Sequence, residues 1–236
     1  MSVHFEVERE ILEAFPGVRI LVVHAAGVEN ARPSPEAEKR WLAAWRGAGA
    51  AEVHGNAQSH PRVRPWRERM QAVGISAKKF PTSIESLLRR ALKGGEAFSI
   101  NPLVDFYNAV SLSRIVPAGG FDAAGLAGGR LALRRTRTGD SFRAIGAEAP
   151  EEVPPGEIAY ATEGDVLTRH LVWRQSERAA IMPETREVFL MSEILGDLPA
   201  EALDEVRTDL IEGLRACFGV EALSAVVDLE SPSVSF

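Results

Sequence analysis

The sequence predicts an α+β fold. Strand-like runs and amphipathic helices follow each other at uneven intervals, without the regular alternation of a doubly wound sheet. The clearest β signal is a pair of apolar runs at 157–161 and 166–173, which the turn-forming residues Thr162-Glu163-Gly164-Asp165 join. Of the 236 residues, 45% are hydrophobic and 25% are charged, so the chain can form the core of one large or two small domains.

Helix signals occur at six places along the chain. Ser34-Pro35 and Asn101-Pro102 each place an N-cap residue before a proline in the first turn. Thr82 and Glu85 form a capping-box pattern, and Gly94-Gly95 ends the helix that follows it. The predicted helices span residues 8–15, 34–47, 61–73, 82–93, 101–112 and 199–216.

Apolar or alternating runs predict further strands at 18–24, 130–136, 188–191 and 226–229. We expect Gly119-Gly120 and Gly128-Gly129 to frame a loop that precedes the strand at 130–136. Neither pair belongs to a phosphate-binding motif, because the chain contains neither G-x-x-x-x-G-K-[ST] nor G-x-G-x-x-G. A nucleotide-binding domain is therefore not expected.

Charge is unevenly distributed along the chain. Residues 1–140 hold 20 Lys and Arg against 14 Asp and Glu, whereas residues 141–236 hold 7 against 19. The segment 62–93 has nine basic residues and two acidic ones, so it can attract phosphates or form a solvated helical face. Trp66 can stack on a base or anchor its helix in the core. The candidate nucleic-acid contacts are Arg62, Arg64, Trp66, Arg67, Lys78, Lys79, Arg89, Arg90 and Lys93.

Several classes of protein are not expected. Cys217 is the single cysteine, which excludes internal disulfides and cysteine zinc sites. The five histidines, at positions 4, 24, 54, 60 and 170, lack metal-binding spacing, and no motif indicates a serine or cysteine nucleophile. The N-terminus does not resemble a signal peptide, and no apolar run approaches the roughly 20 residues of a membrane span. We expect a cytoplasmic protein without a metal, a cofactor or a membrane partner.

A cluster of polar side chains follows the strand predicted at 166–173. Polar loops at the end of a rigid sheet are common places for binding groups. The carboxylate of this cluster could pair with the amino group of an amino-acid ligand or orient a water molecule. The alternative is a solvated hairpin end. The candidate residues are Trp173, Arg174, Gln175, Ser176, Glu177, Arg178 and, further along the chain, Thr185.

Three stretches, in this order, resemble the editing domain (the B3/B4 domain) of the phenylalanyl-tRNA synthetase beta subunit. They are INPLVDFYN at 100–108, PAGGFD at 117–122, and WRQSE at 173–177 followed by ETREVFL at 184–190. The resemblance covers about residues 60–195. It is closer still to freestanding bacterial proteins built from this domain alone, against which it extends over nearly the full length. It implies a single domain over 1–236, with a mixed and antiparallel sheet core flanked by helices.

The resemblance also implies a function. In the synthetase this domain hydrolyses tRNA that carries tyrosine in place of phenylalanine, which suggests a misacylated tRNA as partner here, and a synthetase as a further one. Glu177 matches a glutamate that helps to recognise the misacylated residue, so Glu177, Ser176 and Gln175 are the catalytic candidates. The substrate-binding candidates are Trp173, Arg174, Arg178, Gly119, Gly120, Thr185 and Asn101. Asn101, Asp105 and Asn108 match a helix motif of mainly structural role.

Two positions depart from the family pattern. Gly119 stands where the synthetase has a pocket histidine, and Gln175-Ser176 stand where it has a glycine pair. These changes predict a pocket of different shape, with the backbone of Gly119-Gly120 as a candidate oxyanion site. Two other functions remain open: a non-catalytic module that binds tRNA, a synthetase or an amino acid, and a small-molecule hydrolase without RNA affinity.

Overall fold

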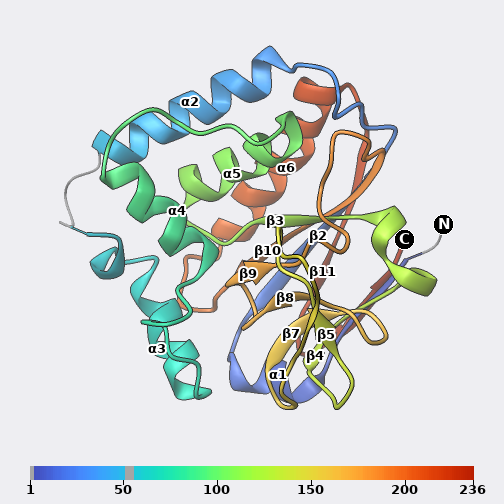
Figure 1. The fold of residues 1–236 in the computed structure, drawn as a ribbon. Coiled ribbons are helices and arrows are strands. Elements are labelled where there is room, and N and C mark those ends of the chain that lie inside the picture. Colours follow the sequence, from blue (N-terminus) through green and yellow to red (C-terminus); the bar gives the residue numbers. More distant parts are fainter. Residues whose placement is uncertain (1–2, 51–55) are drawn as a thin grey trace.

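A computed structural model describes residues 3–50 and 56–236 of the chain. Its helices α2, α4, α5 and α6 lie on one side of a four-stranded sheet, and a six-stranded sheet lies on the other side (Figure 1). One hydrophobic core fills the space between helices and the first sheet, and a second core fills the space between the two sheets. The fold is α+β with mixed and antiparallel sheets, as the sequence predicts.

The four-stranded sheet is antiparallel, in the order β11-β2-β10-β3. Its central strands, β2 (Arg19–Ala26) and β10 (Glu187–Ile194), are apolar runs because they are covered on both faces. Leu21 and Val23 face the helices, whereas Ile20 and Val22 face the other sheet. The edge strands are β11 (Ala222–Val227) and β3 (Gly119–Asp122).

The six-stranded sheet is mixed, in the order β12-β1-β4-β7-β8-β9. Strands β1 and β4 are parallel, and the remaining neighbours are antiparallel. The sequence patterns missed β1 and β12, which are short and join opposite ends of the chain. The bounds are β12 (Ser233–Ser235), β1 (His4–Val7), β4 (Arg130–Arg135), β7 (Ile158–Ala161), β8 (Val166–Arg169) and β9 (Arg174–Gln175); a small separate sheet pairs β5 (Ser141–Phe142) with β6 (Glu151–Glu152).

All six predicted helices are confirmed, with ends shifted by a few residues. The Thr82 hydroxyl accepts a hydrogen bond from the Glu85 backbone N–H, and the Asn101 side chain accepts one from that of Val104, as their capping patterns predict. The helices are α1 (Arg9–Ala14), α2 (Pro35–Ala50), α3 (Arg64–Ala72), α4 (Ser83–Leu92), α5 (Pro102–Arg114) and α6 (Ala202–Phe218), with single 3₁₀ turns at Ala57–Ser59, Ala123–Gly125 and Ala127–Gly129.

Three expectations about the extent or type of an element are wrong. Helix α2 continues through Gly47 to Ala50. Strand β8 ends at Arg169, because His170 and Leu171 both adopt positive φ angles of 47° and 65° and turn the chain back into β9. Gly119-Gly120 belong to strand β3 and pair with β10, so they form no loop.

Candidate functional site

A cavity of about 290 Å³ lies between helices α4 and α5 on one side and strands β3, β7, β8, β9 and β10 on the other. Its volume is close to the lower end of the range for small-molecule sites, about 300–1,000 Å³. Of the residues that the sequence assigns to the site, Trp173, Arg174, Gln175, Gly119 and Gly120 line it. All three stretches that carry the resemblance, 100–108, 117–122 and the one that begins at 173, contribute residues to this lining.

Helix α5 supplies one wall of the cavity through Tyr107 and Asn108. Its first turn is fixed by Asp105, which accepts hydrogen bonds from the Ser99 hydroxyl (2.5 Å) and the Ile100 backbone N–H (3.0 Å). Burial and the nearby Asp105 raise the pKa of the Tyr107 hydroxyl, which therefore stays neutral. Within the described residues the Asn108 amide has no hydrogen-bond partner, so it is available to a ligand.

The buried end of the cavity holds a carboxyl group, Glu193, and a phenol, Tyr160, which the sequence patterns did not select. Glu193 is 3% exposed, and the Tyr160 hydroxyl donates a 2.5 Å hydrogen bond to it. Burial raises the pKa of Glu193 from 4.5 to about 7, although the Tyr160 hydrogen bond opposes this. A group with such a pKa changes charge near neutral pH, which is a property of many functional sites.

The open end of the cavity carries two exposed arginines, Arg90 from α4 and Arg174 from β9. The Arg90 guanidinium lies 4.1 Å from the centre of the Phe98 ring, and that of Arg174 lies 6.0 Å from Trp173. Guanidinium groups bind phosphate and carboxylate oxygens in pairs of hydrogen bonds. The opening is therefore suited to an anionic part of a ligand.

Trp173 is held at the cavity wall by a cluster of rings. Its ring centre lies 4.8 Å from that of Phe80 and 5.4 Å from that of His170. Burial lowers the pKa of His170, so this imidazole is neutral within the cluster. Two residues after Trp173, the Gln175 side chain donates a 2.8 Å hydrogen bond to the Gly120 carbonyl and so connects β9 to β3. These contacts fix the positions of Trp173 and Gln175 in the cavity wall.

Glu177 and Ser176 lie outside the lining of this cavity. The Glu177 carboxylate is about half exposed and forms an ion pair of 3.4 Å with Arg143. Ser176 is buried, where its hydroxyl donates to the Arg143 carbonyl and accepts from the Arg178 backbone N–H. Both residues hold the end of the hairpin against the loop at Arg143.

Three other predicted binding residues also have partners elsewhere. The Asn101 amide donates to the Ile181 carbonyl, and the Asn101 oxygen accepts from Asn30 at 3.0 Å. The Thr185 hydroxyl donates to Asp122 at 2.6 Å. Arg178 is exposed and pairs with Asp165 at 3.3 Å. None of these three residues lines the cavity.

Four of the nine basic residues in the segment 62–93, namely Arg64, Arg67, Arg69 and Arg89, form ion pairs within the described chain. The buried Glu85 carboxylate pairs with Arg67 at 2.8 Å and Arg89 at 2.6 Å, which accounts for both guanidiniums. Arg64 pairs with Glu68, and Arg62 donates to the Arg114 carbonyl. Within the segment 62–93, which the structure describes in full, the exposed basic groups without an ion pair are Lys78, Lys79, Arg90 and Lys93.

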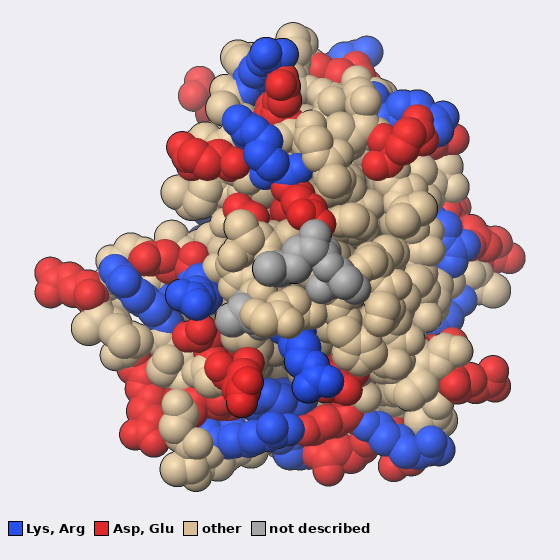
Figure 2. Space-filling view, turned by 90° about the vertical axis from the view of Figure 1, so that its right-hand side faces the viewer, with Lys and Arg blue, Asp and Glu red and all other residues tan. Residues whose placement is uncertain are grey.

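Trp66 lies in the core between the two sheets, with none of its surface exposed. Its ring centre is 6.3 Å from that of Phe15. It therefore anchors α3, and no face of its ring is open to a base. On the face seen in Figure 2, lysines and arginines are interspersed with aspartates and glutamates, so positive charge does not dominate there either.

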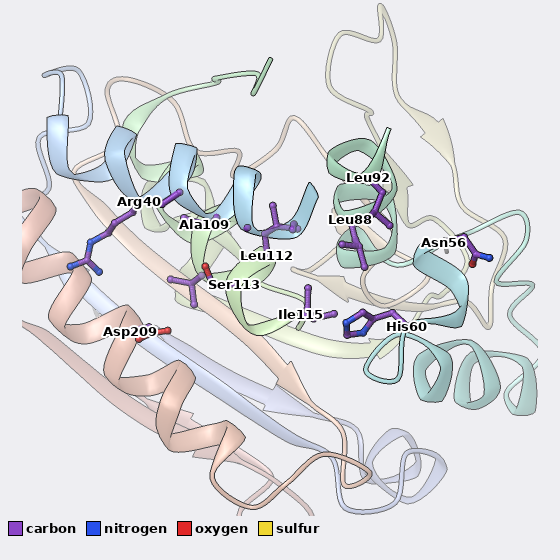
Figure 3. Close-up of a pocket in the computed structure, with 15 residues that line it drawn as sticks. Arg40, Asn56, His60, Leu88, Leu92, Ala109, Leu112, Ser113, Ile115 and Asp209 are labelled. Carbon is purple, nitrogen blue, oxygen red and sulfur yellow. The ribbon is translucent and has the colours of Figure 1, made fainter. Parts of the chain in front are cut away.

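A second cavity, of about 540 Å³, opens between helices α2, α4, α5 and α6 (Figure 3). Arg40 and Asp209 lie at one end of it, and Asn56 and His60 lie at the other. Arg40 pairs with Glu36, and Asp209 accepts hydrogen bonds from Arg114. Most of the remaining lining is aliphatic, namely Ala43, Ala44, Ala48, Leu88, Leu92, Ala109, Val110, Leu112 and Ile115. Since its charged groups are already paired, we assign the candidate site to the smaller cavity.

The described residues include no group of three His, Cys, Asp or Glu side chains that could hold a metal ion. His54 lies outside the described residues. Across 3–50 and 56–236, every helix is too short or too polar to traverse a bilayer.

The fold is an α+β domain with a cavity between its helices and its strands. A family model of the B3/4 domain matches residues 65–199, which is more than half of the chain, and the chain therefore belongs to the B3/4 domain family. The structure also resembles a crystal structure of an N-terminal fragment of the phenylalanyl-tRNA synthetase beta subunit from Pyrococcus horikoshii, with a TM-score of 0.48 and 10% sequence identity. That match covers 95% of this chain and 54% of the other, so this chain spans about half of its length. No curated protein matches.

Proposed function

We propose that this protein is an aminoacyl-tRNA deacylase, which binds the aminoacylated 3′ end of a misacylated tRNA in the smaller cavity and hydrolyses the ester. The observation that carries this proposal is the polarity of the cavity, with exposed arginines at its opening and partly unpaired polar groups inside. The terminal nucleotides of a tRNA are single-stranded and bear phosphates, and the esterified amino acid lies beyond them. Membership of the B3/4 family supports the same substrate.

Arg90 and Arg174 bind the phosphates of the terminal nucleotides. Tyr107, Asn108 and Gln175 contact the ribose and the aminoacyl group, which Trp173 covers on one side. A water molecule adds to the ester carbonyl, the bond from that carbon to the ribose oxygen breaks, and the oxygen takes up a proton. Because the ester is already labile, positioning it beside water contributes most of the rate.

The experiment is deacylation of a panel of mischarged tRNAs by the wild type and by a double variant, Arg90→Ala with Arg174→Ala. We expect the variant to raise KM for the tRNA that the wild type hydrolyses. It should also flatten the salt dependence of binding, since each lost phosphate contact removes about 0.7 from the slope for a single strand. Arg46→Ala removes an equally exposed arginine from α2, away from this cavity, and should leave both properties unchanged. Equal effects of both substitutions would refute the assignment.

A second candidate function is a non-catalytic module that binds the same tRNA end. The described lining of the cavity favours this function, because it contains no serine or cysteine with a histidine beside it to act as a base. Salt-sensitive binding by the wild type, without hydrolysis of any member of the panel, would establish this function and exclude the deacylase.

A further inference from the structure

Glu193 differs from the other buried carboxyl groups in the partners of its side chain. The described chain has four acidic residues in the buried class, namely Glu85, Asp105, Asp140 and Glu193. Glu85 pairs with two arginines, and Asp140 pairs with Arg134 at 2.6 Å. Asp105 receives two hydrogen bonds at the start of α5. Glu193 has the Tyr160 hydroxyl as its side-chain partner and no cation.

The position of Glu193 in β10 explains its surroundings. It shares a strand face with Phe189 and Met191, which face the core between the two sheets. Apart from the cavity, Glu193 borders a small void lined by apolar side chains from α1, β2 and β4 and by Trp66 from α3, whose indole N–H has no hydrogen-bond partner. The titratable or charged groups around it are Tyr160 from β7, Tyr107 from α5, and the two arginines at the opening.

Burying a carboxylate without a cation is costly, because the low polarity of the site disfavours the charged form. A ligand that brings a positive charge to the cavity removes this cost. The opening of the same cavity carries Arg90 and Arg174, which are exposed, whereas Glu193 is buried. The cavity is therefore complementary to a ligand that has an ammonium group at its inner end and an anionic group at its outer end.

We propose that Glu193, positioned by Tyr160, binds a primary ammonium group of the ligand and selects aminoacyl groups whose amine is free. This inference rests on the proposed function, since it places an aminoacyl group in the cavity. The ammonium group is either the α-amino group or the side-chain amine of a basic amino acid. In both cases the contact is a charge-assisted hydrogen bond, which is stronger than a neutral one.

The selection depends on pH in a defined direction. Burial holds the pKa of Glu193 near 7, so the carboxyl is neutral in acid and becomes a carboxylate as the pH rises. The ligand amine loses its proton at higher pH, at about 8 for an α-amino group. Preference for a free amine should therefore increase from pH 5 to about 7.5 and decline above the pKa of the amine.

The test uses non-hydrolysable probes, adenosine 5′-phosphates that carry an alanyl group on the ribose through an amide in place of the ester. One probe has a free α-amine, and the other is N-acetylated. A third carries an N-acetylated lysyl group, whose side-chain amine is free. Dissociation constants are measured by calorimetry for the wild type, Glu193→Gln and Glu187→Gln. The last is a matched control on the same strand, because Glu187 bonds His24 and lies outside the cavity.

We expect the wild type to bind one of the free-amine probes about tenfold or more tightly than the fully blocked probe at pH 7.5. Glu193→Gln, which can still accept the Tyr160 hydrogen bond, should abolish this ratio, and Glu187→Gln should retain it. The α-amine and the side-chain amine are distinguished by which probe is preferred. The pH profile of the free-amine preference in the wild type tests the role of Glu193 without any variant.

The outcomes separate the inference from the proposed function. Equal binding of free and blocked probes by the wild type would refute the role of Glu193 and leave the deacylase proposal intact. A preference that persists in Glu193→Gln, or one that does not weaken toward pH 5, would also refute it. Absence of binding by all three probes would overturn both proposals.

Discussion

The end of the β8–β9 hairpin and the buried end of the cavity each present a carboxyl group, and they differ in every property that matters for binding. Glu177, at the hairpin, is about half exposed and already paired with Arg143. Glu193, in the cavity, is 3% exposed and has a phenol as its side-chain partner. Water screens the first group, so its charge has little effect on its surroundings. The second group acts in a medium of low polarity, where its charge state decides what can enter.

The largest expected effect that separates the two regions is on stability. The folded-state pKa of Glu193, about 7, lies above its ordinary value of 4.5, so folding disfavours the carboxylate. The wild type therefore loses stability through this group as the pH rises from about 4.5 to 7, and the loss is complete above that range. Glu193→Gln should be more stable than the wild type at pH 8 by on the order of 3 kcal/mol, with the difference approaching zero below pH 4.5.

Urea unfolding of both proteins at pH 4.5, 6 and 8 measures this difference. Glu177→Gln is the comparison, because its carboxylate is about half exposed and its ion pair with Arg143 contributes little to stability. A Glu193→Gln difference that does not vary with pH would show that the carboxyl is not held in its neutral form.

How much the sequence predicts depends on whether a signal is local. Helix caps at Thr82 and Asn101 act within four residues, and both were predicted correctly. Strands β1 and β12 pair residues more than 220 positions apart over three or four residues, so no local pattern marks them. The His170 and Leu171 turn was also missed, because positive φ angles are unusual for both residue types.

The candidate site shows the same limit. The family motifs point to the region of the cavity, since Trp173, Arg174 and Gln175 line it. They also favoured Glu177, whose polar neighbours make it conspicuous in the sequence. Glu193 has one local signal, an acidic residue on the inward face of the apolar strand VFLMSEI. Which face of that strand meets a cavity is decided by the packing of α4, α5 and the second sheet, which no single-strand pattern contains.

A smaller effect on stability is expected for Ser176→Ala, which tests whether the end of the β8–β9 hairpin has a structural role. Ser176→Ala removes a buried hydroxyl that bridges the Arg143 carbonyl and the Arg178 backbone N–H. Both backbone groups would lose a partner, so we expect a loss of about 1–3 kcal/mol in the free energy of unfolding. Ser231→Ala, at an exposed serine, is the control. Retained stability together with lost deacylation would instead make Ser176 a functional residue.

The smallest expected effect is that of Glu177→Ala on stability. Both partners of its ion pair are almost half exposed, at 45% and 46%, and pairs of this kind contribute about 0–1 kcal/mol. We expect a change below about 0.5 kcal/mol by urea unfolding, and a change that salt reduces further. The same variant is informative in the deacylation assay, because the carboxylate lies outside the cavity. If turnover falls strongly while stability is retained, Glu177 contacts the tRNA from outside the cavity, and the functional surface extends along the hairpin beyond Trp173.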